Sequence, residues 1–112
     1  MMTASELVTA QIEAYNNRDL KANLDLFSET FQIIQFPSGA VLLNGKESCK
    51  EMYKNLFDSS PDLRAEVINR IDYDNKVILL EIIHGRNGSS TAFQQLIMFE
   101  IIGNKIERLY RF

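Results

Sequence analysis

The chain has 112 residues, of which 46% are hydrophobic and 24% are charged, and its formal net charge is -3. A chain of this length supports one hydrophobic core, so we expect a single domain over residues 1–112. Its 12 basic residues are scattered among 15 acidic ones, which argues against nucleic-acid binding, because that function needs basic residues gathered on one face.

The chain opens with two helical patterns. Apolar residues recur at spacings of 1, 4 and 3 over Ser5–Asn17, as on one face of an amphipathic helix, and Ser5 is a candidate cap. Asp19 follows, a residue type that caps helices by accepting hydrogen bonds from the first turn. It predicts a second, short helix antiparallel to the first, with these apolar residues: Leu20, Leu24, Leu26 and Phe27.

Two short strands and a third helix come next. Phe31–Phe36 has strand composition and is ended by the Pro37–Gly39 turn, after which Val41–Leu43 predicts a short strand. Gly45 precedes the third helical pattern, which stops before Ser59. The apolar residues of this helix share one face: Cys49, Met52, Tyr53, Leu56 and Phe57.

The second half of the chain consists of four β-rich runs. The segments that join them, DYDNK, GRNGSS and GNK, have the Gly, Asn and Asp residues typical of hairpins. Helices followed by such a meander predict an α+β domain in which three N-terminal helices pack on one face of an antiparallel sheet. The four runs are Leu63–Tyr73, Lys76–Gly85, Thr91–Ile102 and Lys105–Phe112.

The middle strands are apolar on both faces. In Leu63–Ile71 the odd positions are apolar apart from Asn69, so we expect the odd face to be buried, with Asn69 on it. In KVILLEIIHG and FQQLIMFEII apolar residues fall on both faces. In an antiparallel sheet with one solvent-exposed face, apolar and polar residues alternate along each strand. The second face therefore needs a cover, and we predict a homodimer through the outer face of the sheet.

Residue counts exclude several chemistries. One histidine, His84, and one cysteine, Cys49, cannot build a Cys/His zinc site, and a single cysteine forms no internal disulfide. The five glycines are isolated, so no phosphate-binding loop is present, and we expect no metal or cofactor. No apolar run approaches the ~18 residues that cross a bilayer, and no signal-peptide pattern is seen. We therefore expect no membrane partner and a cytoplasmic location.

Four segments, which together span nearly the whole chain, carry a resemblance through their order and spacing. They are AYNNRDLKANLDLFSETFQI, PSGAVLLNGKES, PDLRAEVINRI and GNKIERLYRF. Together they resemble the nuclear transport factor 2-like superfamily, in its SnoaL-like and ketosteroid-isomerase-like branch. The resemblance implies a cone-like fold in which a strongly curved sheet wraps around helices and encloses a deep apolar pocket. It also implies that dimers are usual. The superfamily holds isomerases, cyclases, dehydratases and epoxide hydrolases besides members without catalysis, so the fold does not fix the function.

The resemblance assigns three catalytic positions, and none holds an ionisable group here. Ketosteroid isomerases carry a tyrosine on the first helix, an aspartate before the proline of the strand-end turn, and a protonated aspartate on a late strand. The matching residues of this chain are Gln11, Phe36 and, near the third position, Ile97. Proton abstraction next to a carbonyl needs a base in reach and a donor for the developing oxyanion. Isomerase chemistry by that device is therefore not expected.

Glu81 and His84 remain as acid/base candidates. If the face that carries Glu81 lines a cavity, burial raises the pKa of its carboxyl group and makes it suitable for proton transfer. The alternative is a carboxylate paired across strands with Arg70 or Arg108. His84 lies on the opposite, even face. It is either a general base or a hydrogen-bonded histidine near a hairpin or interface, and we favour the second interpretation.

The sequence thus predicts a protein that binds a mainly apolar small molecule and has no recognisable catalytic device. One alternative is an enzyme of isomerase, cyclase or hydrolase type that uses Glu81 or His84. Another is a dimeric interaction module whose pocket is filled by its own side chains, for which Phe36, Phe57 and Phe93 are large enough. The predicted ligand-binding residues are Tyr15, Phe31, Ile33, Gln35, Phe36, Tyr53, Val67, Asn69 and Gln95.

Overall fold

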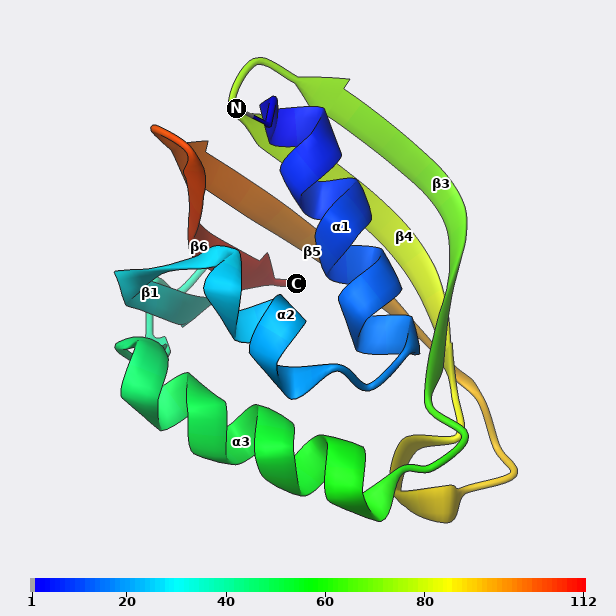
Figure 1. The fold of residues 1–112 in the computed structure, drawn as a ribbon. Helices are drawn as coiled ribbons and strands as arrows, with labels where there is room; N and C mark the ends of the chain where they lie inside the picture. Colours follow the sequence, from blue (N-terminus) through cyan, green and yellow to red (C-terminus); the bar gives the residue numbers. More distant parts are fainter. Residues whose placement is uncertain (1) are drawn as a thin grey trace.

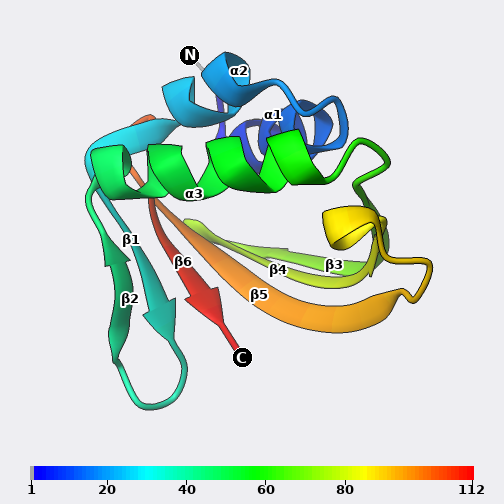
Figure 2. The ribbon, with the colours of Figure 1, turned by 90° about the horizontal axis from the view of Figure 1, so that it is seen from below.

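Three helices pack on the concave face of a six-stranded sheet in the computed structural model, which describes residues 2–112 (Figure 1). The sheet curves strongly, and strands β3, β4 and β5 bend around the side on which the helices lie (Figure 2). This arrangement confirms the predicted α+β cone-like fold. The helices are α1 (Ala4–Asn16), α2 (Leu20–Asp25) and α3 (Lys46–Ser59).

The strands form one sheet in the order β2-β1-β6-β5-β4-β3. All neighbouring strands are antiparallel except β1 and β6, which are parallel because the last strand returns to the middle of the sheet beside the first. The prediction of a wholly antiparallel sheet is wrong for that one pair. The strands are β1 (Phe27–Gln35), β2 (Val41–Asn44), β3 (Arg64–Tyr73), β4 (Lys76–His84), β5 (Phe93–Ile102) and β6 (Lys105–Arg111).

Side-chain caps fix where the first two helices begin. Thr3, rather than Ser5, caps α1, because the Thr3 hydroxyl accepts from the Glu6 amide (3.1 Å) while the Glu6 carboxylate accepts from the Thr3 amide (2.8 Å). This reciprocal pair is a capping box, and it overrides the weaker signal of Ser5. Asp19 caps α2 as predicted, since its carboxylate accepts from the Ala22 amide at 3.1 Å.

The second helix is shorter than predicted, and the first strand starts earlier. Leu26 closes α2, and Phe27 already belongs to β1. Phe27 and Phe31 stack face to face on the buried side of β1, with ring centroids 4.0 Å apart. A spacing of four residues keeps two side chains on one face in a helix and in a strand alike, so the pattern does not separate the two.

A β-bulge in β3 reverses the predicted faces of its second half. Val67 pairs with Glu81, but the next register pair joins Asn69 to Leu80, so one extra residue lies between them. Because successive strand residues point to opposite faces, this insertion turns Asn69 outward. The prediction that Asn69 lies on the buried face is therefore wrong. Arg70 turns inward instead and reaches helix α1.

The two faces of β4 differ in burial, although apolar residues fall on both. Val77, Leu79, Glu81 and Ile83 are buried beneath the helices, whereas the even positions between them are half-buried on the outer face. The outer face is nonetheless largely apolar in β4 and β5. Within residues 2–112, no helix is long and apolar enough to span a bilayer.

Candidate functional site

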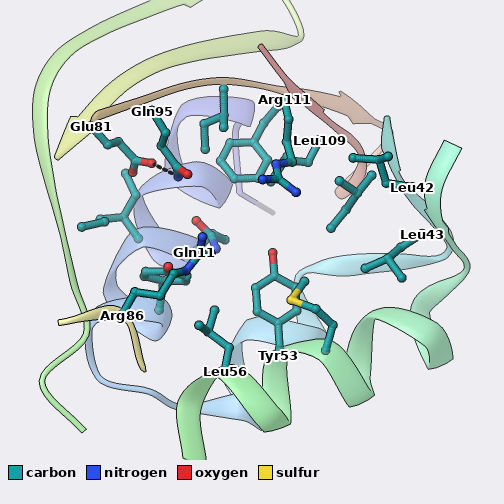
Figure 3. A pocket seen from close by; sticks show the side chains of 17 residues that line it. Gln11, Leu42, Leu43, Tyr53, Leu56, Glu81, Arg86, Gln95, Leu109 and Arg111 are labelled. Atoms are coloured by element: carbon teal, nitrogen blue, oxygen red, sulfur yellow. Dashed lines mark hydrogen bonds between the residues drawn. The ribbon is translucent and has the colours of Figure 1, made fainter. Parts of the chain in front are cut away.

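A cavity of about 350 Å³ lies between the helices and the inner face of the sheet (Figure 3). Helices α1 and α3 form one wall, and strands from across the sheet form the other. The apolar lining residues are Ile12, Ile33, Leu42, Leu43, Met52, Leu56, Ala65, Ile97, Phe99 and Leu109. The polar ones are Gln11, Tyr15, Tyr53, Glu81, Arg86, Gln95 and Arg111.

Glu81 is the one acidic side chain among the described residues of this lining, and it is only 3% exposed. Its cross-strand neighbour Gln95 donates from Nε2 to the carboxylate Oε1 at 2.9 Å (Figure 3). Burial raises the pKa of the Glu81 carboxyl group, and the hydrogen bond from Gln95 opposes that shift. A buried carboxyl group with a raised pKa and an open space in front of it can exchange protons with a bound molecule.

The expected alternative partners of Glu81 are engaged elsewhere. The Arg70 guanidinium binds the Asp72 carboxylate (Nε to Oδ1, 2.8 Å) and α1, and the Arg108 guanidinium binds the Glu100 carboxylate. The prediction of a cross-strand ion pair at Glu81 is therefore wrong.

His84 lies on the outer face of the sheet, away from the cavity. Its Nε2 is 2.9 Å from Oε1 of Glu66 on the adjacent strand. This geometry agrees with the favoured interpretation of a hydrogen-bonded histidine near a hairpin. It excludes His84 as a base for a ligand in the cavity, because strand parity places its ring on the opposite side of the sheet.

Two tyrosines bring hydroxyl groups to the cavity from the helices. Tyr53 points into it from α3 (Figure 3), and Tyr15 lies on the buried face of α1. Burial raises the pKa of both phenols, while Arg86 lowers that of Tyr15 in part. Both hydroxyls are therefore neutral at neutral pH and can donate hydrogen bonds to a ligand.

Gln11 and Ile97, which the resemblance matches to catalytic positions, both line the cavity. Gln11 donates from Nε2 to Oδ1 of the fully buried Asn23 at 3.1 Å, which fixes the orientation of its amide. An amide and an aliphatic chain take up no proton, so the isomerase device remains absent. Among residues 2–112, no three His, Cys, Asp or Glu side chains lie close enough together to hold a metal ion.

Four of the predicted ligand-binding residues line the cavity: Tyr15, Ile33, Tyr53 and Gln95. Phe31 does not line it, because its ring is completely buried against Phe27 in the core. Val67 packs against the core from β3 and is also absent from the lining.

The end of β1, where Gln35 and Phe36 are predicted to bind the ligand, projects beyond the cavity. Gln35 donates from Nε2 to the backbone carbonyl of Arg111 at 3.2 Å, and Phe36 packs on Phe112 with ring centroids 4.6 Å apart. Phe36 is 44% exposed, so neither residue lines the site. Asn69 faces outward because of the β3 bulge and is likewise excluded.

The model of the SnoaL-like domain matches residues 8–109 of this sequence. The chain belongs to the SnoaL-like domain family. This confirms the resemblance to the nuclear transport factor 2-like superfamily. No curated protein matches the sequence.

Solved structures similar to this SnoaL-like domain share its fold at low identity. One is an uncharacterised cystatin-fold protein from Novosphingobium aromaticivorans, 20% identical, with a TM-score of 0.89 over 100% of this chain and 99% of that chain. A protein proposed to be a polyketide cyclase, from Pseudomonas putida, is 22% identical, with a TM-score of 0.77 over 100% and 92%. A ketosteroid-isomerase-like protein from Catenulispora acidiphila, in complex with trimethylamine, is 18% identical, with a TM-score of 0.76 over 98% and 86%.

Sequence reasoning missed the two arginines of the SnoaL-like site. Arg86 lies in the turn after β4, and Arg111 is the last residue of β6, where nothing in the sequence marks either as a cavity residue. Met52 and Leu56 share the apolar face of α3 with Tyr53, a pattern that fits a filled core equally well. Only the curvature of the sheet shows that this face borders an open space.

The cavity of the SnoaL-like domain is open. Phe57 packs edge-on against Tyr15, with centroids 5.8 Å apart and an interplanar angle of 79°, and Phe93 lies under the guanidinium of Arg86. With Phe36 outside, none of the three phenylalanines large enough to fill the pocket does so. The open volume argues against the alternative in which the pocket is filled by its own side chains.

Proposed function

We propose that this SnoaL-like domain binds a mainly apolar small molecule in the cavity between its helices and its sheet. The observation that carries the proposal is an open volume of about 350 Å³ with an apolar lining and a few convergent polar groups. Small-molecule sites in proteins have this size and this combination of surfaces.

A fluorescence titration with the neutral apolar dye N-phenyl-1-naphthylamine tests the proposal. The Met52→Trp variant replaces a flexible thioether in the cavity wall by a bulky indole ring and should abolish the increase in dye emission. The matched control is Met2→Trp, which makes the same exchange at an exposed residue outside the cavity and should leave dye binding unchanged. Emission that stays unchanged on mixing, or dye binding that survives Met52→Trp, contradicts the proposal.

Acid/base catalysis by Glu81 is a second candidate function. Its support is the buried carboxyl group that faces the cavity and has a raised pKa. The similarity to a protein proposed to be a polyketide cyclase is consistent with it. In a screen of cyclisation and isomerisation substrates, Glu81→Gln should abolish turnover and His84→Ala should leave it unchanged. Turnover that is equal in wild type and Glu81→Gln removes Glu81 from the reaction.

We propose further that a second copy of the chain covers the outer face of the sheet. Apolar register pairs lie there, Ile71 with Ile78 and Leu80 with Leu96, and Ile71 is 54% exposed. Stable interfaces bury roughly 800 Å² on each partner, which a sheet face of this kind can supply. Light scattering at micromolar concentration should give the mass of a dimer, and Leu80→Glu should convert it to a monomer. A wild-type monomer mass would contradict the proposal.

A further inference from the structure

Two arginine side chains reach the cavity without an acidic partner. Arg86 follows β4, and Arg111 at the end of β6 is in register with Ile97, whose side chain is on the inner face. Figure 3 shows both side chains among those that surround the cavity. In the described part of the chain, no carboxylate oxygen lies within 4.0 Å of either guanidinium.

Three arginines elsewhere in the fold are engaged. Arg70 binds the Asp72 carboxylate, Arg108 binds the Glu100 carboxylate, and Arg18 donates to the backbone carbonyl of Leu63 at 2.8 Å. The chain has an excess of acidic residues, so partners for Arg86 and Arg111 are not scarce. Arg64 also lacks a carboxylate partner, but it is exposed on the outer face, whereas Arg86 and Arg111 line the cavity.

The charges that face the cavity do not balance. Glu81 is the one acidic residue in the described lining, and the Glu81 carboxylate is bound by the amide of Gln95 rather than by an arginine. Two guanidinium charges therefore face at most one carboxylate charge. The Arg86 guanidinium is also held in place, 5.3 Å from the centroid of the Phe93 ring.

We propose that the ligand of this cavity is an apolar molecule that carries a carboxylate, and that Arg86 and Arg111 bind the carboxylate group. This inference rests on the proposed binding function and adds the chemical class of the ligand. The planar fork of a guanidinium matches two carboxylate oxygens, and such charge-assisted hydrogen bonds are stronger than neutral ones. Arg86 is half-buried and Arg111 is exposed, so water screens part of this attraction.

Two probes of nearly equal shape test the proposal, 2-naphthoate and its neutral amide, 2-naphthamide. Titrations at neutral pH followed by amide nitrogen–proton NMR give the affinity of each probe and show which residues it touches. Naphthoate should bind roughly tenfold more tightly than naphthamide, as expected for one charge-assisted interaction at a partly exposed site. Arg86→Gln and Arg111→Gln should each reduce this preference, and the double variant should remove it, so that the two probes bind with equal affinity.

Arg64→Gln is the matched control. It removes the same charge from an exposed residue whose register partner is His84, on the outer face, and it should leave the preference unchanged. Equal affinity for the two probes, or a preference that survives in the double variant, overturns the carboxylate inference while the binding function stands. If neither probe shifts the amide signals of cavity residues, the binding function and the inference both fail.

Discussion

Replacing Glu81 by glutamine removes an ionisable group from the cavity wall while it keeps the shape of the side chain. The Glu81 side chain is 3% exposed and accepts one hydrogen bond, from Gln95, which a glutamine oxygen can accept equally well. The substitution therefore isolates the free energy of holding a charge in this place. We expect Glu81→Gln to be more stable than the wild type at neutral and higher pH.

The sign of this effect follows from the direction in which the pKa moves on folding. Burial raises the pKa of Glu81 in the folded state, so folding favours the protonated form. At a pH below the ordinary glutamate pKa both states are protonated, and the wild type bears no penalty. Stability is lost as the pH rises from that ordinary pKa through the raised one, and each tenfold difference in proton affinity between the two states corresponds to about 1.4 kcal/mol. Burying a polar group with incomplete compensation costs about 1–3 kcal/mol, which sets the scale of the expected gain.

Thermal unfolding of the two proteins between about pH 4 and pH 8 provides the assay. The difference in free energy of unfolding should be near zero at the acid end and should grow to about 1–3 kcal/mol at the alkaline end, with a Tm several degrees higher for Glu81→Gln. The comparison cancels the contributions of the ionisable groups that the two proteins share. A difference that is independent of pH, or a variant that is less stable at pH 8, would refute the reasoning.

Three further predictions concern other parts of the fold. Gly85→Ala should lower the free energy of unfolding by more than about 2 kcal/mol, because a Cβ would come within 2.4 Å of the Asp62 carbonyl oxygen, whereas Gly88→Ala, with a similar φ and open space, should cost about 1 kcal/mol. Cys49 should resist alkylation in the folded protein at pH 8, since burial raises the pKa of its thiol to about 11; reaction as fast as in urea would contradict this. Thr3→Ala should cost about 1 kcal/mol by denaturant unfolding, and an unchanged midpoint would show that the capping box is dispensable.

Much of the fold can be predicted because hydrophobic periodicity and turn residues agree over long segments. Asp19 correctly marks the start of α2, and the Gly, Asn and Asp residues between the β-rich runs correctly mark the turns. The apolar residues of β4 fall on both faces in the sequence, so the pattern leaves open which face carries Glu81. Errors arise where one local pattern fits two structures. The spacing of Phe27 and Phe31 suits a helix and a strand equally. The structure shows that both residues belong to β1, where their rings stack.

The site is harder to predict than the fold because a cavity depends on how far apart its walls stand. Tyr15 and Tyr53 follow from the apolar faces of their helices, and these faces do border the open space. Arg86 and Arg111 come from a turn and a strand end, and only the curved sheet brings them to the same cavity. The outward position of Asn69 escapes prediction because a bulge leaves no recognisable mark in the amino-acid pattern.

The bulge in β3 places the apolar residues of the two halves of the strand on opposite sides of the sheet. Ala65, before it, forms part of the cavity wall, while Ile71, after it, contributes to the exposed apolar surface on the other side of the sheet. Arg70 meanwhile ties the second half of the strand to α1. One additional residue therefore moves the apolar side chains of this continuous strand from the cavity side of the sheet to its outer side.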